Sequence, residues 1–259
     1  MSRVGSKLKS VAWRTYCFAR MLTGSKSQQA FYGAHFLNSL EGDTVRLAFD
    51  QFAALETSAE LLRTMPNPSA LLADRAALAE RPSGTLGRVF LDFVTANGFD
   101  SEFMTGSAEM FSRMRGEDDR RAWFRLHISV IHDLRHVISG YDASPRGEFC
   151  NLCFTFGQSR HRGIGVLCVF AAMLAIAKGD FGFLPAGLEA VRRGRGSTLI
   201  DLLPWELCLG TPLATCRAAL GVRPPKRSVG QVAPDAYIPE AAGGRVDPVH
   251  SFAGVLSPA

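Results

Sequence analysis

The chain has 259 residues, which suits one large domain or two small ones and allows a sizeable core. Apolar residues make up 47% and charged residues 20%, as in an ordinary soluble globular protein. The net charge of +5 suits anionic membranes or anionic substrates, whereas zinc-finger spacing, an RNP-like motif and dense Lys/Arg runs are missing, which argues against nucleic acid.

Residues 1–26 carry six basic side chains, and the first acidic residue of the chain is Glu41. Apolar side chains such as Trp13 and Tyr16 are interleaved with the bases. Three interpretations stay open: a plain first helix with a solvated basic face, a helix on a membrane surface, or an organellar transit peptide. The N-terminal residues lack the continuous apolar region that is typical of a secretory signal peptide.

Apolar residues at helical spacing predict helices over residues 28–40 and 44–63. A short helix is predicted from Ser69, as its N-cap, to Leu78, and a further helix follows Thr85 and ends at Asn97-Gly98. A polar stretch over 102–121 comes next.

The strongest helical pattern covers residues 122–139, and Gly140 ends it. Helices are also predicted over 145–158, 163–178 and 185–193, with a closing helix over 199–220 that bends at a proline. The apolar run 163–177 has 15 residues, fewer than the about 20 of a transmembrane helix. The first interpretation of this run is a buried helix, and the second is a helix that faces a membrane. A helix that lines a channel for a lipid tail is a further alternative.

The six cysteines lie mostly in apolar surroundings and are interpreted as small buried side chains, which indicates a reducing compartment. Residues 223–259 hold six prolines and show no amphipathic period. We therefore expect an all-α fold with a single multi-helix domain, residues 1–222, whose antiparallel helix pairs surround a metal site. A tail containing Pro and Gly, residues 223–259, follows without a core of its own.

The segment from His132 to His136, with the sequence HDLRH, carries the clearest chemical signal. At about 100° per residue, the two histidines lie about 40° apart on one helix face, so they can bind one ion together. Asp133 lies within reach of the same ion or of its ligands, and an antiparallel next helix brings Glu148 back toward the pair. Two imidazoles with one or two carboxylates suit zinc, and also iron or manganese. The alternative is a pair of ordinary helix histidines.

HDLRH, eleven residues and then Glu148 resemble the HDxxH-x11-E signature of the fourth Coq protein family of ubiquinone biosynthesis. Thr85-Leu86-Gly87 with Phe90 and Phe93 resembles its TLGxxYxxF segment, with Phe90 in place of the usual Tyr. Trp205-Glu206 resembles part of its closing helix. The resemblance spans roughly residues 8–222. Because little room is left before it for a transit peptide, we expect a bacterial source.

The resemblance implies a helical protein that binds one divalent metal, most simply zinc, through His132, Asp133, His136 and Glu148. It implies work on a prenylated hydroxybenzoate, whose C1 carboxylate is removed, in some accounts with oxygen insertion. Arg135 or Arg125 is our candidate for binding that carboxylate.

Expected partners are a polyprenylated benzoate or quinone precursor, other ubiquinone-biosynthesis proteins and a membrane surface, without nucleic acid and with a homodimer left open. The expected place is the bacterial cytoplasm, peripheral on the inner membrane, or the matrix side of the mitochondrial inner membrane in a eukaryote. The rival hypothesis is a non-catalytic, lipid-binding scaffold that organises the biosynthetic enzymes around a structural metal.

Two weaker candidates stand beside this site. Cys150-x-x-Cys153 lacks the second cysteine pair of a zinc ribbon, so core packing is expected. His127 lies about 140° from His132 on the helix wheel and is expected to be a satisfied or surface histidine.

Overall fold

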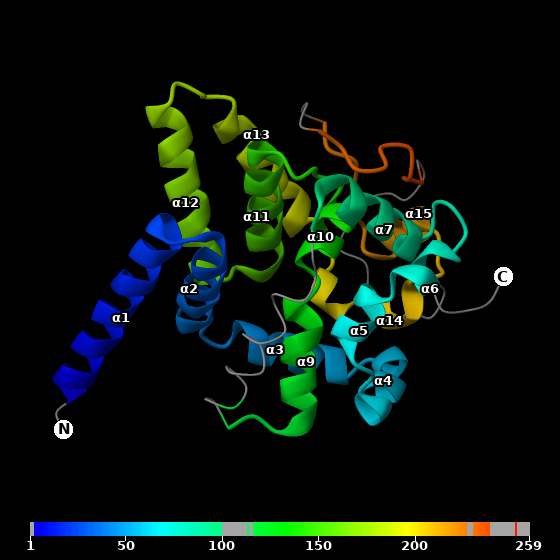
Figure 1. Ribbon diagram of the computed structural model, residues 1–259, viewed down its shortest axis with the longest axis horizontal. Coiled ribbons are helices and arrows are strands. Elements are labelled where there is room, and N and C mark those ends of the chain that lie inside the picture. Colours follow the sequence, from blue (N-terminus) through cyan, green and yellow to red (C-terminus); the bar gives the residue numbers. More distant parts are fainter. Residues whose placement is uncertain (1–2, 100–112, 114–115, 227–229, 239–251, 253–259) are drawn as a thin grey trace.

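The computed structural model describes residues 3–99, 113, 116–226, 230–238 and 252, without the side chains of 3–10, 26, 27, 29 and 30. The predicted all-α class is confirmed: within those residues regular structure is helical, and β pairing is confined to the isolated bridges Thr85–Pro212 and Tyr141–Gln231. The predicted polar stretch 102–121 lies largely outside the described residues. Figure 1 shows the helices and their order.

The first two helices form an antiparallel pair that packs on a later helix. α1 (Arg3–Thr23) and α2 (Lys26–Ser39) meet at Ser25, where a capping box with Gln28 begins α2. The Phe18 ring of α1 lies 5.0 Å from the Phe170 ring of α12 (Arg162–Ala177). In Figure 1 this group, α1, α2 and α12, forms one side of the molecule.

The predicted helix over 44–63 is divided into α3 (Thr44–Ala53), the 3-10 turn η1 (Glu56–Ser58) and α4 (Ala59–Thr64). The buried Ser58 hydroxyl contacts the carbonyls of Phe52 and Leu55, which holds the chain in a turn at the break. The short helix after it also differs from expectation. Asn67, not Ser69, is its N-cap, and Asp74 divides it into α5 (Pro68–Ala73) and α6 (Arg75–Ala79).

The strongest predicted helix, 122–139, is two helices. After α7 (Leu86–Asn97), α9 (Asp119–Ser129) ends at Val130, and α10 (His132–Ser139) starts after Ile131. Val130 and Ile131, between the two helices, are both buried. The sequence has no proline or glycine at this point, so tertiary packing rather than local helix propensity causes the break. The break makes His132 the first residue of α10 rather than a mid-helix residue.

Close packing joins α11 (Pro145–Ser159) to α13 (Phe183–Arg195). A Cβ on Gly194 would lie 2.1 Å from the Phe154 carbonyl oxygen, and one on Gly157 would lie 2.4 Å from that of Val191. Only glycine lets the two backbones approach this closely.

The prediction that the apolar run 163–177 is buried is wrong for most of its length. In α12, Val169 and Met173 are each 62% exposed, and the neighbouring Leu188 of α13 is 55% exposed. The helix has apolar residues on all of its faces, so its sequence contains no polar stripe that could reveal the exposed face. In the described part of the chain, no helix has both the length and the apolar content needed to cross a bilayer.

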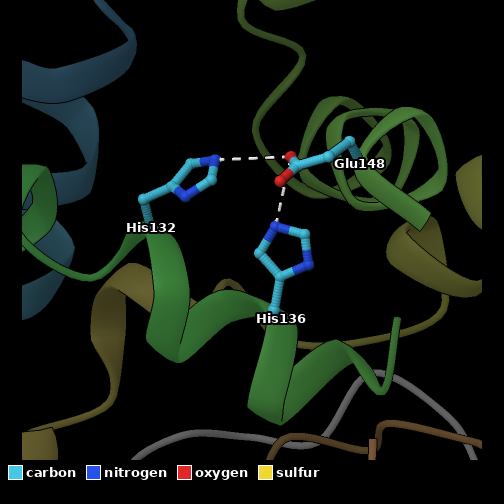
Figure 2. A group of neighbouring side chains, drawn as sticks. All are labelled: His132, His136 and Glu148. Carbon is cyan, nitrogen blue, oxygen red and sulfur yellow. Dashed lines mark ion pairs between the residues drawn. The ribbon is translucent and has the colours of Figure 1, made fainter. Parts of the chain in front are cut away.

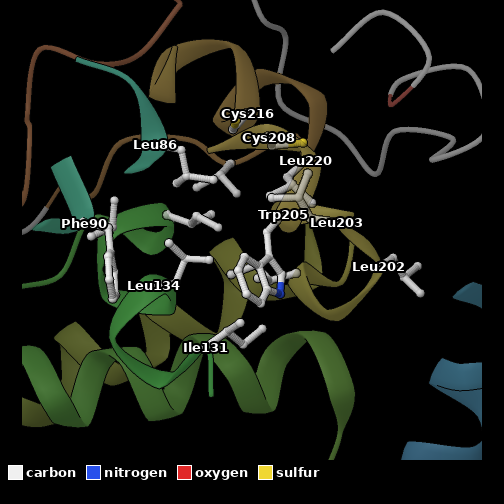
Figure 3. Close-up of a cluster of buried hydrophobic side chains, with 14 of the residues drawn as sticks. Leu86, Phe90, Ile131, Leu134, Leu202, Leu203, Trp205, Cys208, Cys216 and Leu220 are labelled. Atoms are coloured by element: carbon white, nitrogen blue, oxygen red, sulfur yellow. The ribbon is translucent and has the colours of Figure 1, made fainter. Parts of the chain in front are cut away.

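The predicted closing helix over 199–220 is three short pieces. These are η2 (Ile200–Leu202), α14 (Trp205–Cys208) and α15 (Leu213–Ala219), and Pro204 and Pro212 precede the second and third. Trp205 enters the same core cluster as Leu134 of α10 and Phe90 of α7, and Leu134 lies between the two aromatic rings (Figure 3).

The described part of the C-terminal segment packs on α10 and α15. The Val232 N–H donates to the Gly140 carbonyl at 3.1 Å. The fully buried Arg217 guanidinium binds carbonyls of Val137 and Ile138 and also carbonyls between 232 and 236. The division into a domain over 1–222 and a tail over 223–259 stays a prediction.

Candidate metal centre

Three of the four predicted ligands come together between α10 and α11. Ligand atoms of His132, His136 and Glu148 lie within 4.8 Å of one another (Figure 2). The Glu148 Oε2 atom lies 3.2 Å from Nε2 of His136 and 3.7 Å from Nε2 of His132. Both imidazoles therefore point at one carboxylate, as the spacing on the helix wheel predicted.

A tight connection brings Glu148 to this place. Gly140 ends α10 in the left-handed region, at φ 83°, where a side chain is disfavoured. Ser144 then caps α11 by accepting a hydrogen bond from the Gly147 N–H at 3.1 Å, and Pro145 occupies the first turn. Glu148 follows in that first turn, one short connection away from α10.

His136 is held with one bare nitrogen toward Glu148. Its Nδ1 lies 3.0 Å from the Tyr141 carbonyl oxygen, which can only accept, so Nδ1 carries the proton. Its Nε2 is then an acceptor, and this fully buried atom has no hydrogen-bond partner within the described residues. His136 Nε2 and Glu148 Oε2 are both electron-rich and lie 3.2 Å apart, so a cation bound between them would stabilise this arrangement. A histidine fixed by a backbone carbonyl is the usual arrangement at a metal.

Asp133 does not join the three-residue group but orients His132. Its Oδ1 lies 3.0 Å from His132 Nδ1, so that nitrogen donates and Nε2 is left toward Glu148. Partial burial raises the pKa of Glu148, but the positive charge of His132 and His136, when these rings are protonated, outweighs burial and lowers it.

The residues present fit a divalent ion. Two imidazole nitrogens and one carboxylate oxygen are the three-ligand set of many catalytic zinc sites, and they also suit iron or manganese. His132 is 46% exposed at its side chain whereas His136 is fully buried. One side of the site is therefore accessible, as a site that takes water or substrate requires.

The two candidate arginines differ sharply. All five N–H donors of Arg125 are used within the protein, because they bind Glu41, Glu117 and Asn38. Arg135 binds Asp201 through Nη2 alone and lines a cavity beside the candidate centre. Arg135 is therefore the better candidate for a substrate carboxylate.

Two weaker candidates from the sequence, His127 and the cysteine pair Cys150 and Cys153, both lie in the core. His127 is satisfied, as expected, but it is buried: Nδ1 lies 2.6 Å from Glu206 Oε1, and its ring stacks on Trp205. The one sequence signal for this contact was that Trp205-Glu206 resembles part of the family's closing helix. Cys150 and Cys153 are free, buried thiols, which agrees with core packing.

The fold and these side chains define a helical protein with a candidate metal centre between two adjacent helices. The family described as Coenzyme Q (ubiquinone) biosynthesis protein Coq4 matches residues 43–226, and the chain belongs to that family. The resemblance noted from the motifs is thereby confirmed, and the role of the family places the chain in ubiquinone biosynthesis.

Individual relatives agree. The chain is 23% identical over 200 residues to the rat protein named ubiquinone biosynthesis protein COQ4 homolog, mitochondrial, covering 72% of this chain and 68% of the relative. The bovine protein of the same name is 26% identical over 195 residues, covering 73% and 70%. A crystal structure of a Nostoc punctiforme protein, described as a ubiquinone biosynthesis protein, matches with a TM-score of 0.60 and 18% identity over 84% of this chain and 98% of the other. That likeness supports the fold alone.

Proposed function

We propose that this chain binds one divalent metal, most simply zinc, and removes the C1 carboxylate of a polyprenylated hydroxybenzoate in ubiquinone biosynthesis. The observation that carries the proposal is the buried Nε2 of His136, which has no hydrogen-bond partner among the described residues and lies 3.2 Å from the Glu148 carboxylate. His132, His136 and Glu148 hold the ion, and Asp133 orients His132.

A bound divalent ion supplies a Lewis acid that draws electron density from a substrate oxygen. The Tyr141 carbonyl keeps the His136 ring in one tautomer, and Arg135 anchors the substrate carboxylate through N–H groups that Asp201 does not use. In the simple route the ring–carboxylate bond breaks, CO2 leaves, and C1 takes a proton. In the oxidative route the same bond breaks and CO2 leaves, C1 gains a hydroxyl group whose oxygen comes from water, and dioxygen accepts the two electrons and two protons to become hydrogen peroxide.

The test is release of labelled CO2 from a carboxyl-labelled, prenylated hydroxybenzoate, measured together with metal content. Glu148→Ala is expected to lose both metal and turnover while it keeps the helical fold. The matched control is Glu60→Ala, at an exposed carboxylate of α4. Retained turnover in Glu148→Ala contradicts a catalytic role for this metal site, and a wild type that releases no CO2 contradicts the enzyme hypothesis. Product mass separates a ring hydrogen from a ring hydroxyl, and so separates the two routes.

A second candidate is the non-catalytic scaffold that binds the lipid intermediate and organises partner enzymes around a structural metal. The exposed apolar face of α12 and α13 favours it, because a groove of about 830 Å³ there is lined almost entirely by apolar side chains, among them Phe156, Val169 and Leu188. Under this hypothesis the protein binds the prenyl precursor, Glu148→Ala keeps that binding, and neither form releases CO2.

Exposed apolar side chains of α1 and α12 support peripheral membrane binding. Trp13 and Tyr16 of α1 are about half exposed, and α1 contacts α12, whose Val169 and Met173 are exposed. Aromatic and aliphatic side chains beside basic ones suit an anionic bilayer surface. Met173→Glu is expected to weaken co-sedimentation with anionic vesicles, whereas Leu47→Glu, at an exposed site on α3, is the matched control. Equal effects of the two changes count against this face.

For localisation we propose the inner face of a bacterial inner membrane, or the matrix face of the mitochondrial inner membrane in a eukaryote. The relatives' names, which include "mitochondrial", support the second setting for those relatives.

A further inference from the structure

A cavity of about 180 Å³ adjoins the candidate metal centre. His132 and Arg135 of α10 form part of its wall, and residues of α2, α3, α9, α11, α12 and η2 and of the segments between them line the rest. An apolar cavity of about 150 Å³ binds benzene, so this one has the size of a single aromatic ring. Apolar side chains cover much of its wall: Leu37, Val45, Ile128, Leu152 and Ile164.

His161, between α11 and α12, lines this cavity, and its ring is held in place by the start of α12. Its Nδ1 accepts hydrogen bonds from the backbone N–H groups of Gly163, at 3.1 Å, and Ile164, at 3.4 Å. The proton of the neutral ring is therefore on Nε2. Within the described residues that Nε2–H has no hydrogen-bond partner, and His161 lines the cavity. Burial lowers the pKa of His161, which keeps the ring neutral at pH 7.

Arg135 provides a complementary group on the same wall. Its Nη2 binds Asp201, whereas its other N–H groups have no partner within the described residues. The cavity thus offers a cation for a carboxylate, a neutral N–H for an oxygen, and apolar sides for a ring.

We propose that this cavity holds the aromatic ring of a hydroxybenzoate, with Arg135 binding the carboxylate and the His161 Nε2–H donating to a ring hydroxyl or ether oxygen. His161 is then a residue that determines specificity for oxygenated rings. The inference rests on the proposed function and adds the place of the ring and the group that selects it.

The test compares 3,4-dihydroxybenzoate with benzoate, titrated calorimetrically into the purified full chain. The wild type binds the hydroxylated ligand more tightly. His161→Asn keeps a good N-cap for α12 but withdraws the donor from the cavity. It is expected to weaken binding of dihydroxybenzoate about 3- to 10-fold and to leave benzoate unchanged. Ala34→Leu, which fills the cavity from α2, is expected to weaken both ligands. An unchanged preference in His161→Asn overturns the proposal.

A measurement on the wild type covers the case in which the variant fails to fold. In protein labelled with 15N-histidine, the His161 ring is expected to show the Nε2-protonated tautomer and to shift with dihydroxybenzoate but not with benzoate. The absence of that selective shift also overturns the proposal. Ring binding and CO2 release are separate readouts: binding without CO2 release contradicts the proposed function alone, and CO2 release without the His161 effect contradicts this inference alone.

Discussion

Arg125 is expected to stabilise the fold rather than bind substrate. Its guanidinium is 3% exposed and pairs with Glu41, also buried, at 3.0 Å, and with Glu117. Burial disfavours its charge, but the two carboxylates outweigh burial and raise the pKa of Arg125. Arg125→Met leaves those carboxylates without their cation, and removing one partner of a buried pair costs about 3–5 kcal/mol. At about 2–4 °C per kcal/mol for a chain near this size, the melting temperature should fall by roughly 6–20 °C.

The assay is thermal and urea unfolding, followed by circular dichroism, beside Arg46→Met. Arg46 pairs with Asp43 and Asp50 on the surface, so its loss should cost at most about 1 kcal/mol. The double variant Arg125→Met with Glu41→Gln should regain part of the stability, since one unpaired charge is gone. A loss below about 1 kcal/mol in Arg125→Met, or loss of benzoate binding at unchanged stability, refutes this reasoning.

Three further outcomes are expected. Elemental analysis should find about one zinc, iron or manganese ion per chain in the wild type and none in His132→Ala, whereas Asp133→Asn should keep a site weakened about 10- to 100-fold; metal retained in His132→Ala contradicts the site. Burial holds the pKa of His161 below its ordinary value of about 6.5, so on acidification the unfolded chain binds a proton before the folded chain does. The contribution of His161 to the free energy of unfolding is therefore complete above about pH 6.5 and is lost as the pH falls toward the folded-state pKa. His161→Asn should flatten that decline in urea titrations, and an equally steep decline excludes His161 as its source. Gly194→Ala should cost about 1–3 kcal/mol or more in urea unfolding, because its Cβ meets an α11 carbonyl at 2.1 Å, whereas Gly196→Ala, with 3.5 Å to its nearest atom, should cost little.

The sequence predicted where helices lie better than where they break. Periodicity located α2, α7, α11 and α13 to within a few residues. It missed the breaks at Val130-Ile131 and at Asp74, because neither has a proline or glycine. Those breaks depend on buried contacts with distant segments, and such contacts leave no local signal.

The exposure of α12 illustrates a second limit. A helix that is apolar all round has no polar stripe, so its sequence is the same whether protein, lipid or water covers it. Only the packing of α2, α11 and α13 around it shows which side remains free, and that side carries Val169 and Met173.

The sequence predicted that His132, His136 and Glu148 lie together, but it did not predict that Asp133 stands outside the group or what surrounds the candidate centre. The spacing of His132 and His136 on one helix face is local, so it survives the break just before His132. Whether an arginine has N–H groups left for a substrate depends on partners that are distant in the sequence. Arg125 meets Glu41, which lies 84 residues away in the chain, and Arg135 meets Asp201, which lies 66 residues away. Two arginines in adjacent helices therefore look alike in the sequence but differ in how many of their N–H groups the protein itself uses.

The break before α10 has a consequence for the centre itself. A helix continuing from α9 would surround the first histidine with backbone on both sides, but here His132 begins a new helix, and its side chain is 46% exposed while His136, one turn later, is fully buried. One ligand is thus fixed in the core by Tyr141 and Phe93, and the other borders the cavity that His161 and Arg135 line. An ion held between them has a protein side and an accessible side. That asymmetry favours a site that receives a substrate over a closed structural site.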